Sequence, residues 1–86
     1  MKKLEFFTLI TGAGGLLGRY HAEALLEIEE NILLTDISLS NLNTLKENLY
    51  KSYGNRKILV EKLDVTSEKS ILNLLKKLKF KKIVIK

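Results

Sequence analysis

The sequence alternates short apolar runs with segments in which apolar residues recur at helical spacing. Leu4–Thr11 is rich in aromatic and β-branched residues and ends at a glycine, which is typical of a buried strand. Three later runs have strand length: Asn31–Asp36, Lys57–Leu63 and Ile83–Ile85. Strands that alternate with helices form parallel sheets through right-handed crossovers. The pattern therefore predicts one α/β domain over residues 1–86, in the order β-α-β-α-β-α-β.

The segments between these runs are predicted to be helices. In the first, the apolar residues at helical spacing are Leu16, Leu17, Tyr20, Ala24, Leu25 and Ile28. The second follows Ser38 and Ser40, which are both good N-caps, and ends before Gly54. Its apolar stripe is Leu42, Leu45, Leu49 and Tyr53. The third starts after Ser67, and its predicted buried face is Ile71, Leu72, Leu74, Leu75 and Leu78.

Composition excludes several kinds of site. The chain has no cysteine and a single histidine, His21. Disulfides, thiolate metal sites and thiol nucleophiles are therefore excluded, and a zinc site is not expected. The longest uncharged run, Phe6–Gly18, has thirteen residues and is too short to span a bilayer. We expect a cytoplasmic protein without a membrane partner.

The positive charge is concentrated at the C-terminal end. The net charge is +5, and residues 68–86 hold seven lysines and one acid. One hypothesis is a basic module that binds nucleic acid, an anionic membrane or a protein partner. The cluster contains only one aromatic residue, Phe80, and its helix needs its apolar stripe for the sheet. We therefore interpret the lysines as a solvated face and expect no nucleic-acid partner.

The segment with the clearest chemistry is the glycine-rich turn Thr11–Gly18, between the first strand and the first helix. A turn there directs backbone N–H groups and the positive end of the helix dipole at one point, which suits a pyrophosphate. We expect Gly12 to allow the tight turn, Gly15 to let phosphates approach, and Gly18 to let the helix pack closely on the sheet. A P-loop is excluded because Arg19 follows Gly18. The alternative is a glycine-rich connection without a ligand.

A second marker is Asp36, at the end of the second strand and eighteen residues after Gly18. An acid about 20 residues after the glycines accepts hydrogen bonds from the adenosine ribose and repels a 2′-phosphate. This spacing favours NAD over NADP. The alternative is a solvated carboxylate at a strand end.

The motif TGxxGxxG, formed by Thr11, Gly12, Gly15 and Gly18, resembles that of the short-chain dehydrogenase/reductase family, in the form carried by its extended branch and some bacterial relatives. The resemblance implies a partial Rossmann fold, a doubly wound parallel sheet between two helix layers, and an NAD cofactor. It places Asp64 and Val65 near the adenine, although Asp64 and Thr66 could instead cap the third helix. The implied cofactor-binding residues are Thr11, Gly12, Gly14, Gly15, Leu16, Leu17, Gly18, Asp36, Ile37, Asp64 and Val65.

The resemblance covers about the first third of such an enzyme and none of its catalytic residues. Tyr53 and Lys57 fit the family's Tyr-x-x-x-Lys spacing, but Gly54 and Asn55 break the helix on which that pair must lie. We therefore reject them, and we assign no catalytic role to His21. The sequence predicts a truncated, dinucleotide-binding portion of an oxidoreductase that transfers no hydride alone.

The family's strand order also predicts how the chain associates. It places the first strand beside the fourth and leaves the fourth, Ile83–Ile85, at an edge of the sheet. We expect self-association through this unpaired edge.

Overall fold

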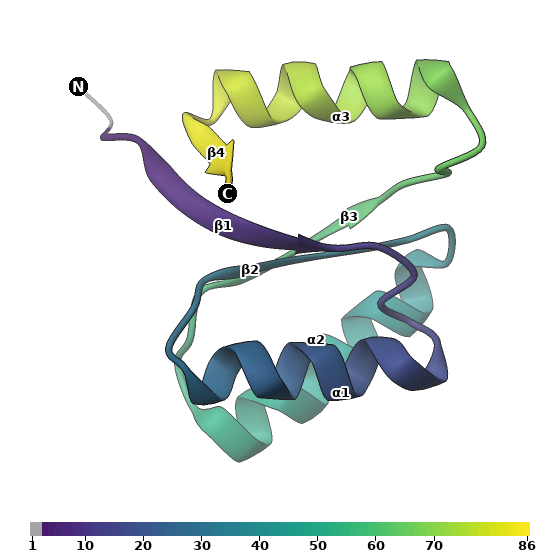
Figure 1. Cartoon of the computed structure of the whole chain (residues 1–86). Coiled ribbons are helices and arrows are strands. Elements are labelled where there is room, and N and C mark those ends of the chain that lie inside the picture. The colour runs from purple at the N-terminus through teal and green to yellow at the C-terminus, as the bar shows by residue number, and fades with distance from the viewer. Residues whose placement is uncertain (1–2) are drawn as a thin grey trace.

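The computed structural model describes residues 3–86, and Figure 1 shows the predicted alternation of strands and helices. The elements are β1 (Glu5–Ile10), α1 (Leu16–Glu27), β2 (Ile32–Asp36), α2 (Leu39–Tyr53), β3 (Ile58–Lys62), α3 (Glu68–Phe80) and β4 (Ile83–Ile85). Each one lies within the range that the apolar pattern predicts. Within residues 3–86, no helix has both the length and the apolar character that a membrane crossing requires.

The strands form one parallel sheet in the order β3-β2-β1-β4. Helix α3 covers one face of the sheet, and α1 and α2 cover the other, so the chain has three layers (Figure 1). This confirms the predicted partial doubly wound α/β fold and the position of β1 beside β4. Because all strands are parallel, the ends of β1, β2 and β3 that precede their helices meet at one edge of the sheet, the carboxyl edge.

Each face of the sheet has its own apolar core. On the α1 and α2 side, the buried residues from the sheet include Ile10, Ile32, Leu34 and Ile58. Helix α2 contributes the stripe predicted for it: Leu42, Leu45 and Leu49 are buried, and Tyr53 packs beside them. On the α3 side, the core consists of Phe7, Leu33, Leu63, Leu74 and Leu78.

The apolar residues at helical spacing in α1 do not form its buried face. Of the apolar residues at helical spacing, Leu16, Leu17, Tyr20, Ala24 and Ile28 are exposed and only Leu25 is half-buried. The buried residues are instead Gly18, Ala22 and Leu26. Two of these are small, and small side chains let a helix axis approach its neighbours closely. The helix therefore turns its smallest stripe inward and leaves larger apolar side chains in solvent.

The predicted face of α3 is also too wide. Leu74 and Leu78 are buried, whereas Ile71, Leu72 and Leu75 are exposed. The short strand β4 and the edge position of β3 give α3 only a narrow strip of sheet to cover.

The caps of α2 and α3 are those that the sequence predicts. Ser38 accepts a hydrogen bond from the Asn41 backbone N–H (3.3 Å), and Ser67 accepts one from the Ser70 backbone N–H (3.1 Å). Gly54 ends α2 with a φ of 75°, a conformation that favours glycine.

Candidate functional site

The glycine-rich turn is held in place by backbone bonds within itself and to β2. Gly12 has a φ of 61°, in the left-handed region that favours glycine. The Gly15 N–H donates to the Gly12 carbonyl at 3.0 Å, and the Ala13 N–H donates to the Thr35 carbonyl at 2.9 Å. The buried Thr35 hydroxyl in turn donates to the Ile10 carbonyl at 2.7 Å. The turn therefore has a fixed shape set by the neighbouring strand.

Gly18 allows a close approach between α1 and the backbone of the turn. A Cβ atom on Gly18 would lie 2.4 Å from the carbonyl oxygen of Ala13 and 2.5 Å from its Cα. The start of the helix therefore lies against the backbone of the turn, while Ala22 and Leu26 further along α1 pack in the core that the helix shares with the sheet. Only a residue without a Cβ fits at this position.

The first turn of α1 has no capping side chain. Gly15 is the N-cap, no side chain bonds the first N–H groups, and the first helical turn contains no acid. Leu16 lies at this end with 81% of its surface exposed, and Leu17 beside it is also exposed. These donors and the positive end of the helix dipole are therefore accessible to an anion.

The carboxylate of Asp36 is bonded to the glycine turn, a contact that sequence reasoning missed. Its Oδ2 accepts from the Gly14 N–H at 2.9 Å, and its Oδ1 accepts from the Ser38 N–H at 3.2 Å. A Cβ on Gly14 would lie only 3.0 Å from Oδ2 and 3.0 Å from the Cβ of Asn41. A side chain at position 14 would therefore crowd both the Asp36 carboxylate and α2. The feature of the sequence that points to this contact is the order of β1 and β2, because strands that pair as neighbours bring the glycine turn and Asp36 to the same edge of the sheet.

These bonds leave Asp36 able to bind further hydroxyl groups. A carboxylate has about four acceptor positions, two on each oxygen. The two backbone N–H groups occupy one position on each oxygen. The two that remain match the pair of hydroxyls on a ribose, so the residues present fit a dinucleotide at this corner.

Asp64 follows β3 at the same edge of the sheet, and its carboxylate bonds Thr66. Oδ1 accepts from the Thr66 hydroxyl at 2.6 Å and from its backbone N–H at 2.9 Å. These bonds stabilise the ionised form and hold the pKa of Asp64 below its usual range. Because Ser67 is the N-cap of α3, the side chain of Asp64 caps no helix. Its role as an adenine contact stays a prediction.

Two apolar side chains extend the carboxyl edge. Ile37, after β2, is 61% exposed, and Val65, after β3, is 59% exposed. Each directly follows one of the two acids in the sequence, Asp36 and Asp64. Exposed apolar side chains beside hydrogen-bond acceptors are the surroundings that a flat heterocycle prefers.

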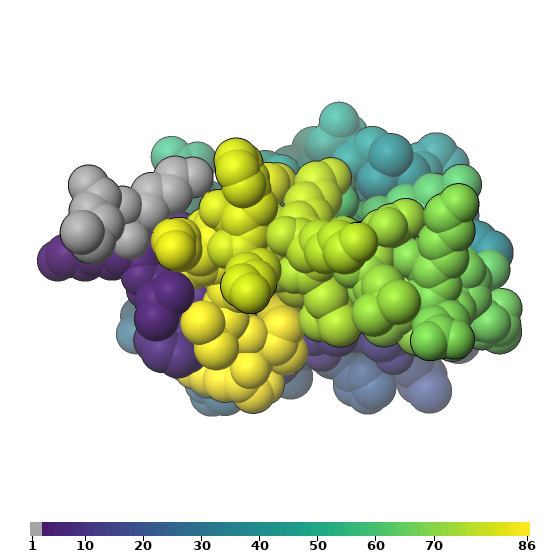
Figure 2. All heavy atoms as spheres, turned by 90° about the horizontal axis from the view of Figure 1, so that it is seen from above, coloured from purple at the N-terminus to yellow at the C-terminus, as the bar shows by residue number. Residues whose placement is uncertain are grey.

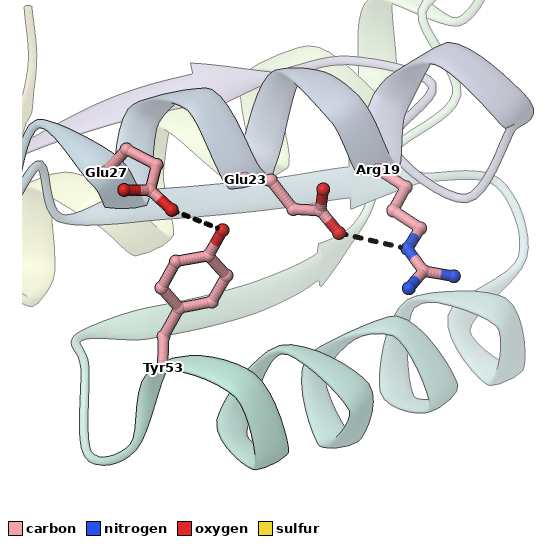
Figure 3. Close-up of polar contacts among 4 residues, drawn as sticks. All are labelled: Arg19, Glu23, Glu27 and Tyr53. Atoms are coloured by element: carbon pink, nitrogen blue, oxygen red, sulfur yellow. Dashed lines mark hydrogen bonds and ion pairs between the residues drawn. The ribbon is translucent and has the colours of Figure 1, made fainter.

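The structure does not gather all the predicted residues into one hollow. A groove of about 500 Å³ between α1 and α2 is lined by Ala13, Gly14, Gly15 and Leu16 of the turn and by residues of both helices. Asp64 instead lines a separate groove of about 450 Å³ against α3. Arg19 lines the first groove but bonds Glu23 on its own helix at 3.2 Å, as Figure 3 shows.

Tyr53 is the last residue of α2 and Lys57 directly precedes β3, so the break predicted at Gly54 and Asn55 separates them. The Tyr53 hydroxyl donates to Glu27 of α1 at 3.0 Å (Figure 3), and this bond raises the pKa of Tyr53. Lys57 is bonded to Glu5 on β1. Each side chain thus bonds a different carboxylate, and the tyrosine pKa moves away from the value that a proton donor at neutral pH needs.

Comparisons with known proteins reveal the fold and no sequence relative. No family model matches the sequence. No curated protein matches it either. Nine chains in solved structures do match, and all three of those described next are reductases or dehydrogenases by name.

The first is YwfH, an NADPH-dependent reductase involved in bacilysin biosynthesis, with a TM-score of 0.80 and 15% identity over 92% of this chain. The second is sorbitol-6-phosphate 2-dehydrogenase SrlD from Erwinia amylovora, with a TM-score of 0.75 and 24% identity over 92% of this chain. The third is a bulky-bulky ketone specific alcohol dehydrogenase from Comamonas testosteroni, with a TM-score of 0.71 and 23% identity over 90% of this chain.

The matched region is a small part of each of these enzymes. It covers 33% of YwfH, 33% of SrlD and 31% of the alcohol dehydrogenase, so this chain spans about a third of their length. Over that third the likeness is one of fold. The chain thus has the α/β fold of the matched region in each of these enzymes, as its glycine motif predicts.

Proposed function

We propose that this chain binds a nicotinamide dinucleotide through its ADP portion, as part of a short-chain dehydrogenase/reductase-like oxidoreductase of the cytoplasm. By this proposal the described residues supply the nucleotide-binding corner, and the chain alone transfers no hydride. The fold shared with three reductases and dehydrogenases supports the oxidoreductase class.

The observation that carries the proposal is the bond between Asp36 and the glycine turn. It supports the proposal because the uncapped end of α1 and the carboxylate of Asp36 lie on the two sides of Gly14. A diphosphate would accept from the uncapped N–H groups of α1, and the ribose would donate to Asp36. The exposed Ile37 and Val65 would lie against the adenine.

The carboxylate of Asp36 favours NAD over NADP. A 2′-phosphate would lie beside this negative charge and would be repelled by it. YwfH, which shares the fold, is NADPH-dependent. The experiment must therefore compare both cofactors directly.

The test is an NMR titration of the ¹⁵N-labelled chain. We expect ADP-ribose and NAD to shift the amide signals of Thr11–Gly18. Nicotinamide mononucleotide, which has one phosphate and no adenosine, should shift them less at the same concentration, because the ADP portion makes most of the contacts. NADP should bind more weakly than NAD. The proposal is wrong if neither NAD nor ADP-ribose shifts these amide signals at about 10 mM. That result would mean a binding free energy weaker than about 3 kcal/mol.

Asp36→Asn separates the role of the charge from that of the fold. The asparagine keeps one oxygen but loses the negative charge, so the ratio of NAD to NADP affinity should fall roughly tenfold. Glu47→Gln is the matched control, since Glu47 is exposed on α2 and forms no ion pair within residues 3–86. An unchanged ratio in Asp36→Asn would remove Asp36 from the ribose site.

A further inference from the structure

The groove of about 500 Å³ between α1 and α2 begins at the glycine turn. Gly14 belongs to its lining and donates its N–H to Asp36 Oδ2 at 2.9 Å. All the lining residues lie between positions 13 and 48, in the turn and the two helices. The groove therefore starts beside the carboxylate to which the proposed function assigns the ribose.

Arg19 is the one charged residue that lines this groove within residues 3–86. Its side chain is 56% exposed and extends from α1 toward α2 (Figure 3). The Nε–H donates to Glu23 Oε1 at 3.2 Å, and this is the one hydrogen bond of the guanidinium in the described chain. A guanidinium has five N–H donors in a planar fork, so the four on the terminal nitrogens of Arg19 are free to bind an anion.

The ion pair between Arg19 and Glu23 can be exchanged at little cost. The two residues are four positions apart at the surface of α1, and exposed pairs of this kind contribute little to stability. Glu23 accepts from a single N–H of the fork, whereas a phosphate can accept from two at once. A phosphate in the groove would therefore compete with Glu23 for the guanidinium.

The α2 wall of the groove adds polar groups but no charge. Asn41 and Asn48 line this wall, and a carboxamide can donate to an oxygen anion. Four of the seven lysines in residues 68–86 lie on α3, which occupies the face shown in Figure 2, on the other side of the sheet from α1 and α2. An anion in the groove would therefore meet Arg19 as its cation.

We propose that this groove is a second phosphate subsite, in which Arg19 leaves Glu23 and binds the 2′-phosphate of an adenosine ribose held at Asp36. The inference rests on the proposed function, because the ribose must first lie beside Asp36. The two charged side chains would act in opposite directions, since the carboxylate repels a 2′-phosphate and the guanidinium attracts it. Their balance then sets how strongly NADP is disfavoured.

The probes are NAD and NADP, which differ only in the 2′-phosphate, titrated separately into the ¹⁵N-labelled chain. We expect both to shift the amide signals of Thr11–Gly18. NADP should also shift the Nε–H signal of Arg19, because the phosphate replaces Glu23, and NAD should leave that signal close to its ligand-free position. The ratio of the two dissociation constants measures the contribution of the groove.

Three variants test the role of the guanidinium. Arg19→Gln should weaken NADP binding roughly tenfold, the loss of one charge-assisted hydrogen bond, and change NAD binding less than about twofold. Glu23→Gln frees the guanidinium and should strengthen NADP binding about twofold, within the range for exposed ion pairs. Arg56→Gln is the matched control, because it removes the same group beyond the C-terminal end of α2 and does not line the groove. None of the three residues is buried, so the variants should fold normally.

Four results would overturn the inference and leave the proposed dinucleotide site intact. The first is an equal loss of NAD and NADP affinity in Arg19→Gln, which would place Arg19 at the diphosphate. The second is an unchanged ratio in Arg19→Gln, and the third is the same change of ratio in Arg56→Gln. The fourth is inorganic phosphate shifting the Arg19 Nε–H signal at the same concentration as NADP, which would indicate a general anion site. Failure of both NAD and NADP to shift Thr11–Gly18 would instead refute the proposed function, and this inference with it.

Discussion

Replacing Gly18 with alanine tests the central packing contact of the candidate site. The new Cβ would lie 2.4, 2.5 and 2.6 Å from three backbone atoms of Ala13. Those atoms cannot move freely, because the Ala13 N–H is bonded to Thr35 and the next residue, Gly14, is bonded to Asp36. We therefore expect α1 to shift away from the turn.

The cost of this shift can be worked out from the geometry. Real Cβ contacts are rarely shorter than 3.4 Å, so the helix must move by roughly 1 Å. Overpacking of this kind costs about 1–3 kcal/mol, and a backbone neighbour places the cost near the upper end. The better helix propensity of alanine offsets about 1 kcal/mol. The expected net loss is about 2 kcal/mol, or roughly 8–16 °C in Tm for a domain of this size.

Urea unfolding followed by far-UV circular dichroism measures this loss. Gly12→Ala is the comparison, since its Cβ meets no atom within 4 Å and the substitution costs only the strain of a positive φ, about 1 kcal/mol. Amide signals of α1 should move in Gly18→Ala and stay in place in Gly12→Ala. A Gly18→Ala chain as stable as the original would show that the close approach does not exist.

Three further predictions concern hydrogen bonds and helix ends. The bonds from Thr66 lower the pKa of Asp64, so their contribution to stability is full above about pH 4 and disappears as the pH falls through the lowered pKa. In Asp64→Asn, the stability should therefore change less with pH below about pH 4. An unchanged dependence of stability on pH in this acidic range would contradict the prediction. The bond to Glu27 raises the pKa of Tyr53, so its contribution to stability persists at neutral pH and is lost only above about pH 10. Ultraviolet titration of Tyr53→Phe should lack the phenolate phase with the highest midpoint, and the loss of an earlier phase instead would exclude the bond. Glu29 has a φ of 61° after α1; Glu29→Gly should raise the stability by up to about 1 kcal/mol, and a lower urea midpoint would refute this.

The order of the elements could be predicted because local signals agree with one another. Ser38 and Ser67 cap helices where an apolar run ends, and Gly54 ends α2 with the positive φ that the sequence suggests. Each strand lies in a short run rich in apolar residues between such signals. When local preferences and the apolar pattern point to the same structure, the sequence alone defines the architecture.

The buried face of α1 could not be predicted because apolar size is a poor guide where the packing is tight. Leu17, Tyr20 and Ile28 look like a core stripe, yet the helix buries Gly18 and Ala22. A pattern of hydrophobicity records which side chains prefer to be buried, and not how closely two backbones approach. The distance between α1 and the turn decides the face, and that distance is a property of the fold.

The candidate site likewise combines features that the sequence predicts with features that only the fold determines. The glycines and Asp36 are identifiable from their spacing, because the turn and the strand end are both local features. The bond from Gly14 to Asp36 joins residues 22 positions apart and depends on the pairing of β1 with β2. The separate grooves of the turn and of Asp64 likewise follow from the positions of α2 and α3.

The attachment of the glycine turn to β2 has a consequence for any mutational survey of this protein. Thr35 is buried and far from solvent, yet its carbonyl and hydroxyl hold the turn and the end of β1 together. Removing the hydroxyl would leave the Ile10 carbonyl without that donor in the interior, which costs about 1–3 kcal/mol. If the turn binds a dinucleotide as proposed, a substitution of the buried Thr35 would therefore weaken that binding from inside the sheet, and a survey confined to exposed residues would not detect it.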